Sequence, residues 1–144
     1  MLVYPVTIER DGKGWFASFP DVPEALTSGR SRAHALSMAQ DALASAMEFY
    51  FEDRRPVPLP GKATAGQDTV ELPASLSAKV LLMNEMLLQG VTPAELARRL
   101  DTTPQSVQRI IDLDHVTKID TIAQAFRVMD RRLDFQVKRC PQSA

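Results

Sequence analysis

With 144 residues, the chain has room for one ordinary domain or for two small ones. Hydrophobic residues make up 44% and charged residues 24%, which is typical of a globular protein and argues against disorder over most of the length. The formal net charge of -1 excludes a basic field over the whole molecule, so any nucleic-acid binding must depend on a local patch.

The first part of the chain predicts three short strands. Residues 2–9 alternate with the period of two that is typical of a strand. One face would carry Leu2, Tyr4, Val6 and Ile8, and the other Val3, Pro5, Thr7 and Glu9. Turn residues follow at 11–14 and residues 15–19 alternate again, so we expect a hairpin. Residues 24–27 predict a third short strand, which ends at Gly29.

A helix should follow, because Ser31 is a suitable N-cap and the residues after it have amphipathic spacing. One such helix packed on a small sheet gives an α+β layer. We expect its buried stripe to contain Leu36, Ala39, Leu43, Ala46, Met47 and Tyr50.

Prolines at alternate positions between residues 54 and 61 predict a linker or an extended arm, because proline lacks an amide donor and disfavours helix before it. We place this Pro/Gly-rich linker from about residue 53 onward and expect two domains, residues 1–66 and residues 67–144. Residues 69–72 predict a fourth short strand, which either returns to the N-terminal sheet or closes the linker.

The second half predicts helices. Pro73 begins the first of them, and Gly90 is a good terminator because glycine adopts a left-handed backbone at little cost. The face of this helix expected to be buried carries Leu76, Val80, Met83 and Leu87.

Three further helix starts follow along the chain. Thr92 and Glu95 have the spacing of a capping box, in which Glu95 reaches back to the cap, and a proline stands between them at the first helical position. Thr103 precedes another proline in the same way, and Thr117 with Asp120 forms a third possible cap.

The apolar residues of these segments have the order and spacing of a helix-turn-helix. Ala97 is small enough for two helices to cross there, and Asp101 occupies the turn position that is usually glycine. The alternative is a helical bundle with a solvated polar face. The apolar anchors of the motif are Leu96, Ala97, Leu100, Val107 and Ile110.

The second helix of such a motif enters the major groove of double-stranded DNA, which we therefore predict as a partner. Glutamine pairs with adenine and arginine with guanine, whereas helix starts and cations suit phosphate. The candidates for base contacts are Gln105, Ser106, Gln108 and Arg109, and those for phosphate contacts are Thr102, Thr103 and Lys118.

A terminal strand is predicted where Leu133, Phe135 and Val137 alternate with polar residues. One strand alone is not stable. We therefore expect it to pair with, or pack beside, the same strand of a second chain in a DNA-binding dimer.

Several classes of site are not expected. The single cysteine, Cys140, argues against a disulfide or a cysteine-based zinc site, and we predict no metal and no other cofactor. The start lacks the pattern of a signal peptide, and the longest strongly apolar stretch, residues 80–83, is far too short to cross a membrane. We expect a cytoplasmic protein that does not bind membranes.

We also expect no enzymatic activity and no catalytic residue. A metal-dependent nuclease needs several converging carboxylates, but the first predicted strand offers only Glu9. His34 and His115 are far apart in sequence and have no nucleophile signature beside them.

Over nearly its whole length the chain resembles the HicB antitoxins, in the branch that carries a helix-turn-helix. The runs that carry the resemblance are Tyr4-Pro5-Val6-Thr7, residues 19–27, the segment from Ala42 to Asp53, Pro58-Leu59-Pro60, Lys79-Val80-Leu81-Leu82, residues 95–99 and Thr117-Lys118-Ile119-Asp120.

The resemblance implies a partial ribonuclease-H-like β-β-β-α-β domain, followed by an all-α helix-turn-helix domain with a short C-terminal strand. It implies that the first domain neutralises a HicA toxin, a small RNA-cleaving protein, and that the second represses the toxin-antitoxin operon. It also implies a homodimer or a higher oligomer such as a tetramer.

An RNA-cleaving toxin should be basic, so acidic side chains could guide it and cover it. A transcriptional repressor whose N-terminal domain senses a small ligand is the alternative function, and a degenerate nuclease is another. The candidates for toxin contacts are Trp15, Asp21, Glu24, Glu48, Glu52 and Asp53.

Overall fold

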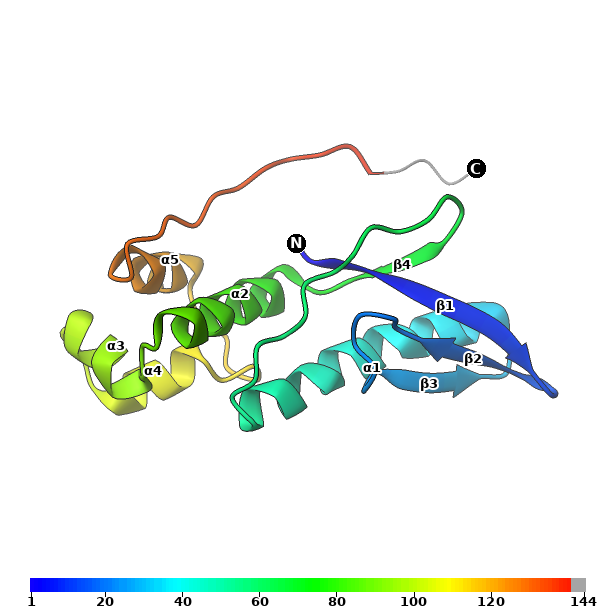
Figure 1. Cartoon of the computed structure of the whole chain (residues 1–144), viewed down its shortest axis with the longest axis horizontal. Coiled ribbons are helices and arrows are strands. Elements are labelled where there is room, and N and C mark those ends of the chain that lie inside the picture. The colour runs from blue at the N-terminus through cyan, green and yellow to red at the C-terminus, as the bar shows by residue number, and fades with distance from the viewer. Residues whose placement is uncertain (141–144) are drawn as a thin grey trace.

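The computed structural model describes residues 1–140 and shows a mixed α+β protein (Figure 1). The last four residues of the expected second domain, 141–144, lie outside the described part. The elements in chain order are β1 (Val3–Asp11), β2 (Gly14–Ser18), β3 (Leu26–Gly29), α1 (Arg32–Glu52), β4 (Asp68–Glu71), α2 (Ala74–Gln89), α3 (Pro93–Arg99), α4 (Pro104–Ile110) and α5 (Ile119–Arg127).

The strands form one antiparallel sheet in the order β3-β2-β1-β4. The predicted hairpin of β1 and β2 is confirmed, with Asp11 opposite Gly14 and Gly12 at a φ of 61° in the turn. The fourth predicted strand returns to the sheet, where Val3 lies opposite Glu71. A boundary between residues 66 and 67 therefore separates β4 from the sheet that it completes, and the N-terminal layer extends to Leu72, which is fully buried in the same core.

Helix α1 packs along one face of the sheet (Figure 1). Ser31 caps it by accepting a hydrogen bond from the His34 N–H, as predicted. The end of β3 approaches the first turn so closely that a Cβ added to Gly29 would lie 2.4 Å from the Ala35 nitrogen, so only glycine fits there. The predicted stripe is buried apart from Leu36, which is half-buried, and with Tyr4, Val6 and Val70 from the sheet it forms the first hydrophobic cluster.

Helices α2 to α5 enclose a second hydrophobic cluster. Helix α2 ends at Gly90, whose φ of 67° confirms the predicted terminator. Val80 of α2 belongs to the first cluster, whereas Leu82, Met83 and Met86 belong to the second. Since Phe51 at the end of α1 packs against both, the two clusters adjoin where α1 meets α2.

The expected terminal strand is not formed in the single chain. Residues 131–140 hold no strand and extend away from α5 along the upper side of Figure 1. Phe135 and Val137, two apolar residues of the predicted strand, are 74% and 98% exposed. The physical reason is that a lone strand has no neighbour with which to form hydrogen bonds.

None of the helices in residues 1–140 combines the length and the apolar character that a membrane span requires.

Candidate functional site

The starts of α3 and α4 are built by the same local chemistry. The Thr92 hydroxyl accepts a hydrogen bond from the Glu95 N–H at 3.1 Å, and the Thr103 hydroxyl accepts one from the Ser106 N–H at 3.2 Å. Each helix has proline in its first turn, where a missing amide donor costs nothing. Both predicted threonine caps are thus confirmed.

A tight turn joins α3 to α4. Asp101 adopts a left-handed φ of 53°, and the Thr102 N–H donates to the Ala97 carbonyl at 2.9 Å. This bond satisfies a carbonyl at the end of α3, as left-handed helix ends usually do. The aspartate therefore fills the role expected of glycine at this position.

The predicted apolar anchors lie between these helices and the rest of the second cluster. Leu96, Ala97, Val107 and Ile110 are at most 5% exposed, and Leu100 is half-buried against the same cluster. The small Ala97 is buried in α3, and α3 packs against α4. Their polar faces are thereby turned toward solvent.

The capping box at α3 is only half formed. Glu95 does not reach back to Thr92, and its carboxylate instead accepts hydrogen bonds from Arg98 and Arg99, at 2.9 and 3.0 Å from their Nε atoms. These bonds hold the pKa of Glu95 at about 2. Hydrogen bonds between a carboxylate and a guanidinium group are stronger than a bond to a neutral backbone amide. The carboxylate therefore bonds to the two arginines.

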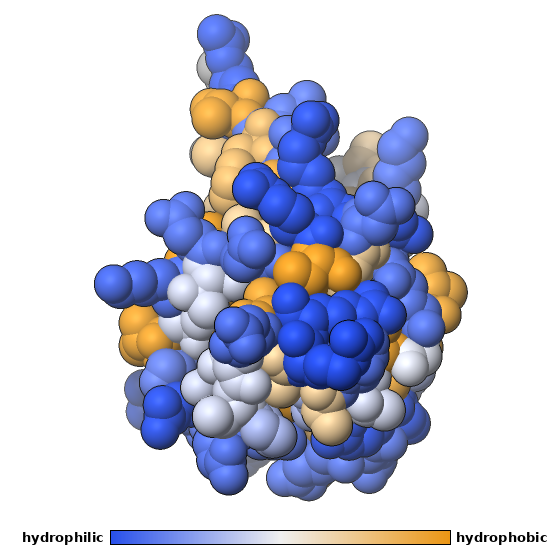
Figure 2. Space-filling view, turned by 90° about the vertical axis from the view of Figure 1, so that its left-hand side faces the viewer, coloured by the Kyte–Doolittle hydropathy of each residue, from blue (hydrophilic) through white to orange (hydrophobic). Residues whose placement is uncertain are grey.

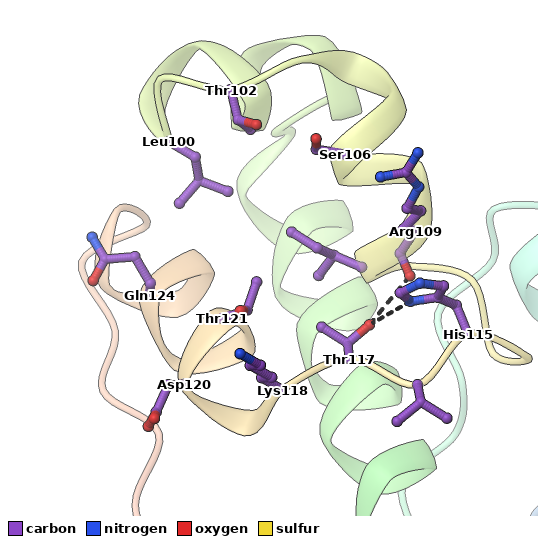
Figure 3. Close-up of a pocket in the computed structure, with 12 residues that line it drawn as sticks. Leu100, Thr102, Ser106, Arg109, His115, Thr117, Lys118, Asp120, Thr121 and Gln124 are labelled. Carbon is purple, nitrogen blue, oxygen red and sulfur yellow. Dashed lines mark hydrogen bonds between the residues drawn. The ribbon is translucent and has the colours of Figure 1, made fainter.

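Thr117 is not the cap of α5, which was the third expected cap. The helix begins at Ile119 with Lys118 at the cap position and no side-chain cap bond. The Thr117 hydroxyl donates to the Arg109 carbonyl at 3.4 Å and lies 3.2 Å from Nδ1 of His115 (Figure 3). Thr117 therefore ties the loop after α4 to the end of α4.

The residues predicted to contact DNA lie around α4 and the start of α5. All are exposed except Ser106, which is half-buried. Figure 2 views the end of the molecule that carries α3, and its surface is mainly hydrophilic with separate apolar patches. A hollow of about 610 Å³ lies beside α4, and four of the seven candidates line it, namely Thr102, Ser106, Arg109 and Lys118 (Figure 3).

Lys79 on α2 is a residue that the sequence analysis missed as a functional candidate. Its side chain is 1% exposed, and its ammonium group donates to the carbonyls of Arg109, Asp112 and His115. Burial lowers the pKa of Lys79, and the charge of Asp112 opposes this shift. The available signal was a lysine inside the otherwise apolar run from residue 78 to residue 83.

Two of the predicted toxin contacts are engaged within the chain. Asp21 accepts a hydrogen bond from the Gly61 N–H at 2.9 Å. Glu24 accepts one from the Tyr50 hydroxyl at 2.5 Å and forms an ion pair with Arg55 at 3.4 Å. Both carboxylates therefore hold the segment that follows α1.

This segment, residues 55–61, is a strap fixed along its length rather than a free arm. The Tyr4 hydroxyl donates to the Pro58 carbonyl at 2.7 Å. Asn84 of α2 accepts from the Val57 N–H at 2.8 Å and donates to the Val57 carbonyl at 2.9 Å. The guanidinium group of Arg55 also lies 4.3 Å from the centre of the Tyr50 ring.

The remaining acidic candidates lie at the C-terminal end of α1. Glu52 and Asp53 are exposed, and Glu48 is half-buried. Burial raises the pKa of Glu48, and the nearby charges of Asp114, Asp112 and Glu52 raise it further. A second hollow, of about 500 Å³, runs between Glu48 and Glu52 on one side and Asp114 on the other.

The Trp15 side chain is packed against the core and is not fully exposed on the surface. It is half-buried against the first cluster, and the guanidinium group of Arg10 lies 5.7 Å from the centre of its ring. In the sheet register Phe16 lies opposite Glu9, on the face that α1 does not cover. Trp15 is therefore the hairpin aromatic that belongs to the core.

Within the described part of the chain, no group of three or more His, Cys, Asp or Glu side chains is arranged to hold a metal ion.

A family model and the relatives among known proteins all indicate one family. The family model of the "HicB_like antitoxin of bacterial toxin-antitoxin system" matches residues 3–81, through β4 and into α2. The chain is 56% identical over 131 residues to Antitoxin HicB 2 of Photorhabdus laumondii, covering 91% of this chain and 93% of that protein. It is 41% identical over 131 residues to Antitoxin HicB of Escherichia coli strain K12, covering 90% and 95%. It is 34% identical over 139 residues to Antitoxin HicB of Pseudomonas fluorescens, covering 96% and 95%.

We expect Glu24→Gln to lower the thermal unfolding midpoint near neutral pH by a small amount, corresponding to less than about 1 kcal/mol for a partly exposed ion pair. The bond from Tyr50 and the charge of Arg55 lower the pKa of Glu24. Its stabilisation is therefore present above the pKa of the unfolded carboxyl and is lost as the pH falls through the lowered value. Circular dichroism melting of both proteins across this range should show the difference vanish in acid.

The matched control is Glu9→Gln, which neutralises an exposed carboxylate on β1 and should leave the midpoint unchanged. A Glu24→Gln difference that persists into strong acid would contradict the role given to this carboxylate.

Proposed function

The chain belongs to the HicB-like family of bacterial antitoxins, and we propose that it neutralises a HicA-type RNA-cleaving toxin and represses its own operon by binding operator DNA. The observation that carries the second activity is the pair α3 and α4, both capped by threonine and joined by a turn at Asp101. We propose that they form a helix-turn-helix and that the protein acts in the cytoplasm by binding rather than by catalysis.

In this proposal α4 is the reading helix. Gln105, Gln108 and Arg109 are exposed, and their amide and guanidinium groups can contact base edges in the major groove. Ser106 shares this surface. Thr102, Thr103 and Lys118 flank it at the starts of α4 and α5, where they would contact phosphates.

Replacing Gln105, Gln108 and Arg109 together with alanine should weaken operator binding roughly 100-fold or more, because each good base contact contributes about 1–3 kcal/mol. Binding to duplex DNA from the region directly upstream of the operon, measured at one fixed salt concentration, tests this. Toxin neutralisation should survive.

The matched control is Gln40→Ala with Arg30→Ala, which removes the same residue types from exposed positions in the N-terminal part. Equal affinity of the triple variant and the wild type would show that α4 does not read the operator.

We propose that the toxin docks on the acidic C-terminal end of α1. Glu48, Glu52 and Asp53 lie there, with Asp112 and Asp114 nearby in the loop after α4. A basic RNA-cleaving protein would be attracted to this surface. Asp21 and Glu24 would contribute indirectly by holding the strap, and Trp15 by supporting the sheet.

Replacing Glu48 and Glu52 with glutamine and Asp53 with asparagine should slow toxin association about tenfold at low salt, since charge complementarity acts mainly on the association rate. Surface plasmon resonance with the co-expressed toxin, repeated over several salt concentrations, measures both the rate and its salt dependence.

The control removes the same charge from the sheet, as Glu9→Gln, Asp11→Asn and Glu71→Gln, all at exposed positions. An equal loss in this control would place the docking surface on the sheet instead.

We propose that the chain has two functional parts, the sheet-and-helix layer up to Leu72 and the helices that follow it. We also propose that it forms a dimer. The exposed Phe135 and Val137 would pair with, or pack beside, the same segment of a second chain, and such dimers could associate further into tetramers. Deleting residues 132–144 should then reduce the mass in solution, measured by light scattering. An unchanged dimer would rule out this role of the tail.

A further inference from the structure

The helix α2 carries a positive charge into the interior of the protein. Lys79 is 1% exposed, and in residues 1–140 no carboxylate forms an ion pair with it. A buried charge is strongly unfavourable unless its hydrogen bonds are complete. The ammonium group of Lys79 therefore needs hydrogen-bond acceptors inside the protein.

All three donors of the ammonium group are used. Nζ donates to the carbonyl oxygens of Arg109 at 3.2 Å, Asp112 at 2.5 Å and His115 at 2.6 Å. An ammonium group has three donors and no acceptor, so these bonds saturate it. A neutral side chain of the same length could not satisfy three carbonyls at once.

The three carbonyls belong to the end of α4 and to the loop that leads to α5. Arg109 lies in the last turn of α4, where helix carbonyls carry partial negative charge, and its carbonyl also accepts from the Asp112 N–H at 3.3 Å. His115 is also linked to Thr117, which donates to the same Arg109 carbonyl (Figure 3). Lys79 thus closes a network that defines where α4 ends and how the loop leaves it.

We propose that Lys79 is a positioning residue for operator recognition, which holds the C-terminal end of α4 and so sets the angle at which Gln105, Gln108 and Arg109 meet the groove. The inference rests on the proposed operator binding. Lys79 itself is buried and does not touch DNA. It acts through backbone carbonyls of the helix that does.

The test compares variants of the full chain at a temperature where all are folded. Lys79→Met keeps the apolar stem and removes the three donors, whereas Lys79→Arg keeps the charge and several donors. Asn84→Ala is the matched control, because Asn84 also bonds from α2 to a backbone, but to Val57 of the strap.

Two measurements are made on each variant. Amide hydrogen exchange reports the opening of residues 110–118 and of the strap. Affinity for duplex DNA from the region directly upstream of the operon is measured at fixed salt.

In Lys79→Met we expect faster exchange at residues 110–118 and about tenfold weaker DNA binding. Lys79→Arg should recover at least part of the affinity. Asn84→Ala should speed exchange at Val57 and leave DNA affinity unchanged.

The inference is overturned if loop exchange in Lys79→Met equals that of the wild type, or if the loop opens while DNA affinity stays the same. An equal loss of affinity in Asn84→Ala would also overturn it, because general destabilisation would explain both. If Lys79→Met does not fold, Lys79→Gln replaces it under the same criteria. Failure of the wild type to bind this duplex overturns operator binding itself, a result distinct from equal binding by wild type and Lys79→Met.

Discussion

Four consecutive buried residues in α2 constrain the rest of the molecule. Residues 77–80 are all buried, and four successive positions cover every side of a helix with 3.6 residues per turn. Polar groups in that stretch must find partners inside the protein. Ser77 accepts from the Leu2 N–H and donates to the Leu72 carbonyl, whereas Lys79 binds the end of α4. The residue before β1, the residue after β4 and the last turn of α4 are consequently all bonded to one helix.

Features that depend on a few neighbouring residues were predictable from the sequence. Ser31, Thr92 and Thr103 cap helices through bonds to amides three residues away, and Gly90 and Asp101 adopt left-handed backbones where helices end. The hairpin follows from periodicity together with the turn residues at 11–14, and the amphipathic stripe of α1 follows from periodicity. Most of the helix positions could be predicted from the sequence. The residues of α4 that face solvent could therefore be predicted as well.

Features that depend on distant partners were not predictable in the same way. Thr117 has a choice between capping α5 and bonding to the Arg109 carbonyl at the end of α4. Glu24 meets Tyr50 and Arg55 only after the chain has folded back, and Lys79 meets carbonyls 30 or more residues away. For Thr117, Glu24 and Lys79, contact with another segment decides which bond forms, whereas Glu95 chooses among partners on its own helix.

The place where the two hydrophobic clusters adjoin has a consequence for how such proteins diversify. Phe51 from the first half packs against both clusters, and Leu113, from the loop after α4, packs against the first. The halves are therefore not interchangeable modules. Recombination between two relatives would produce a well-packed chimera only when the crossover brings a compatible pair at these two positions. The two halves should therefore be inherited together more often than separately.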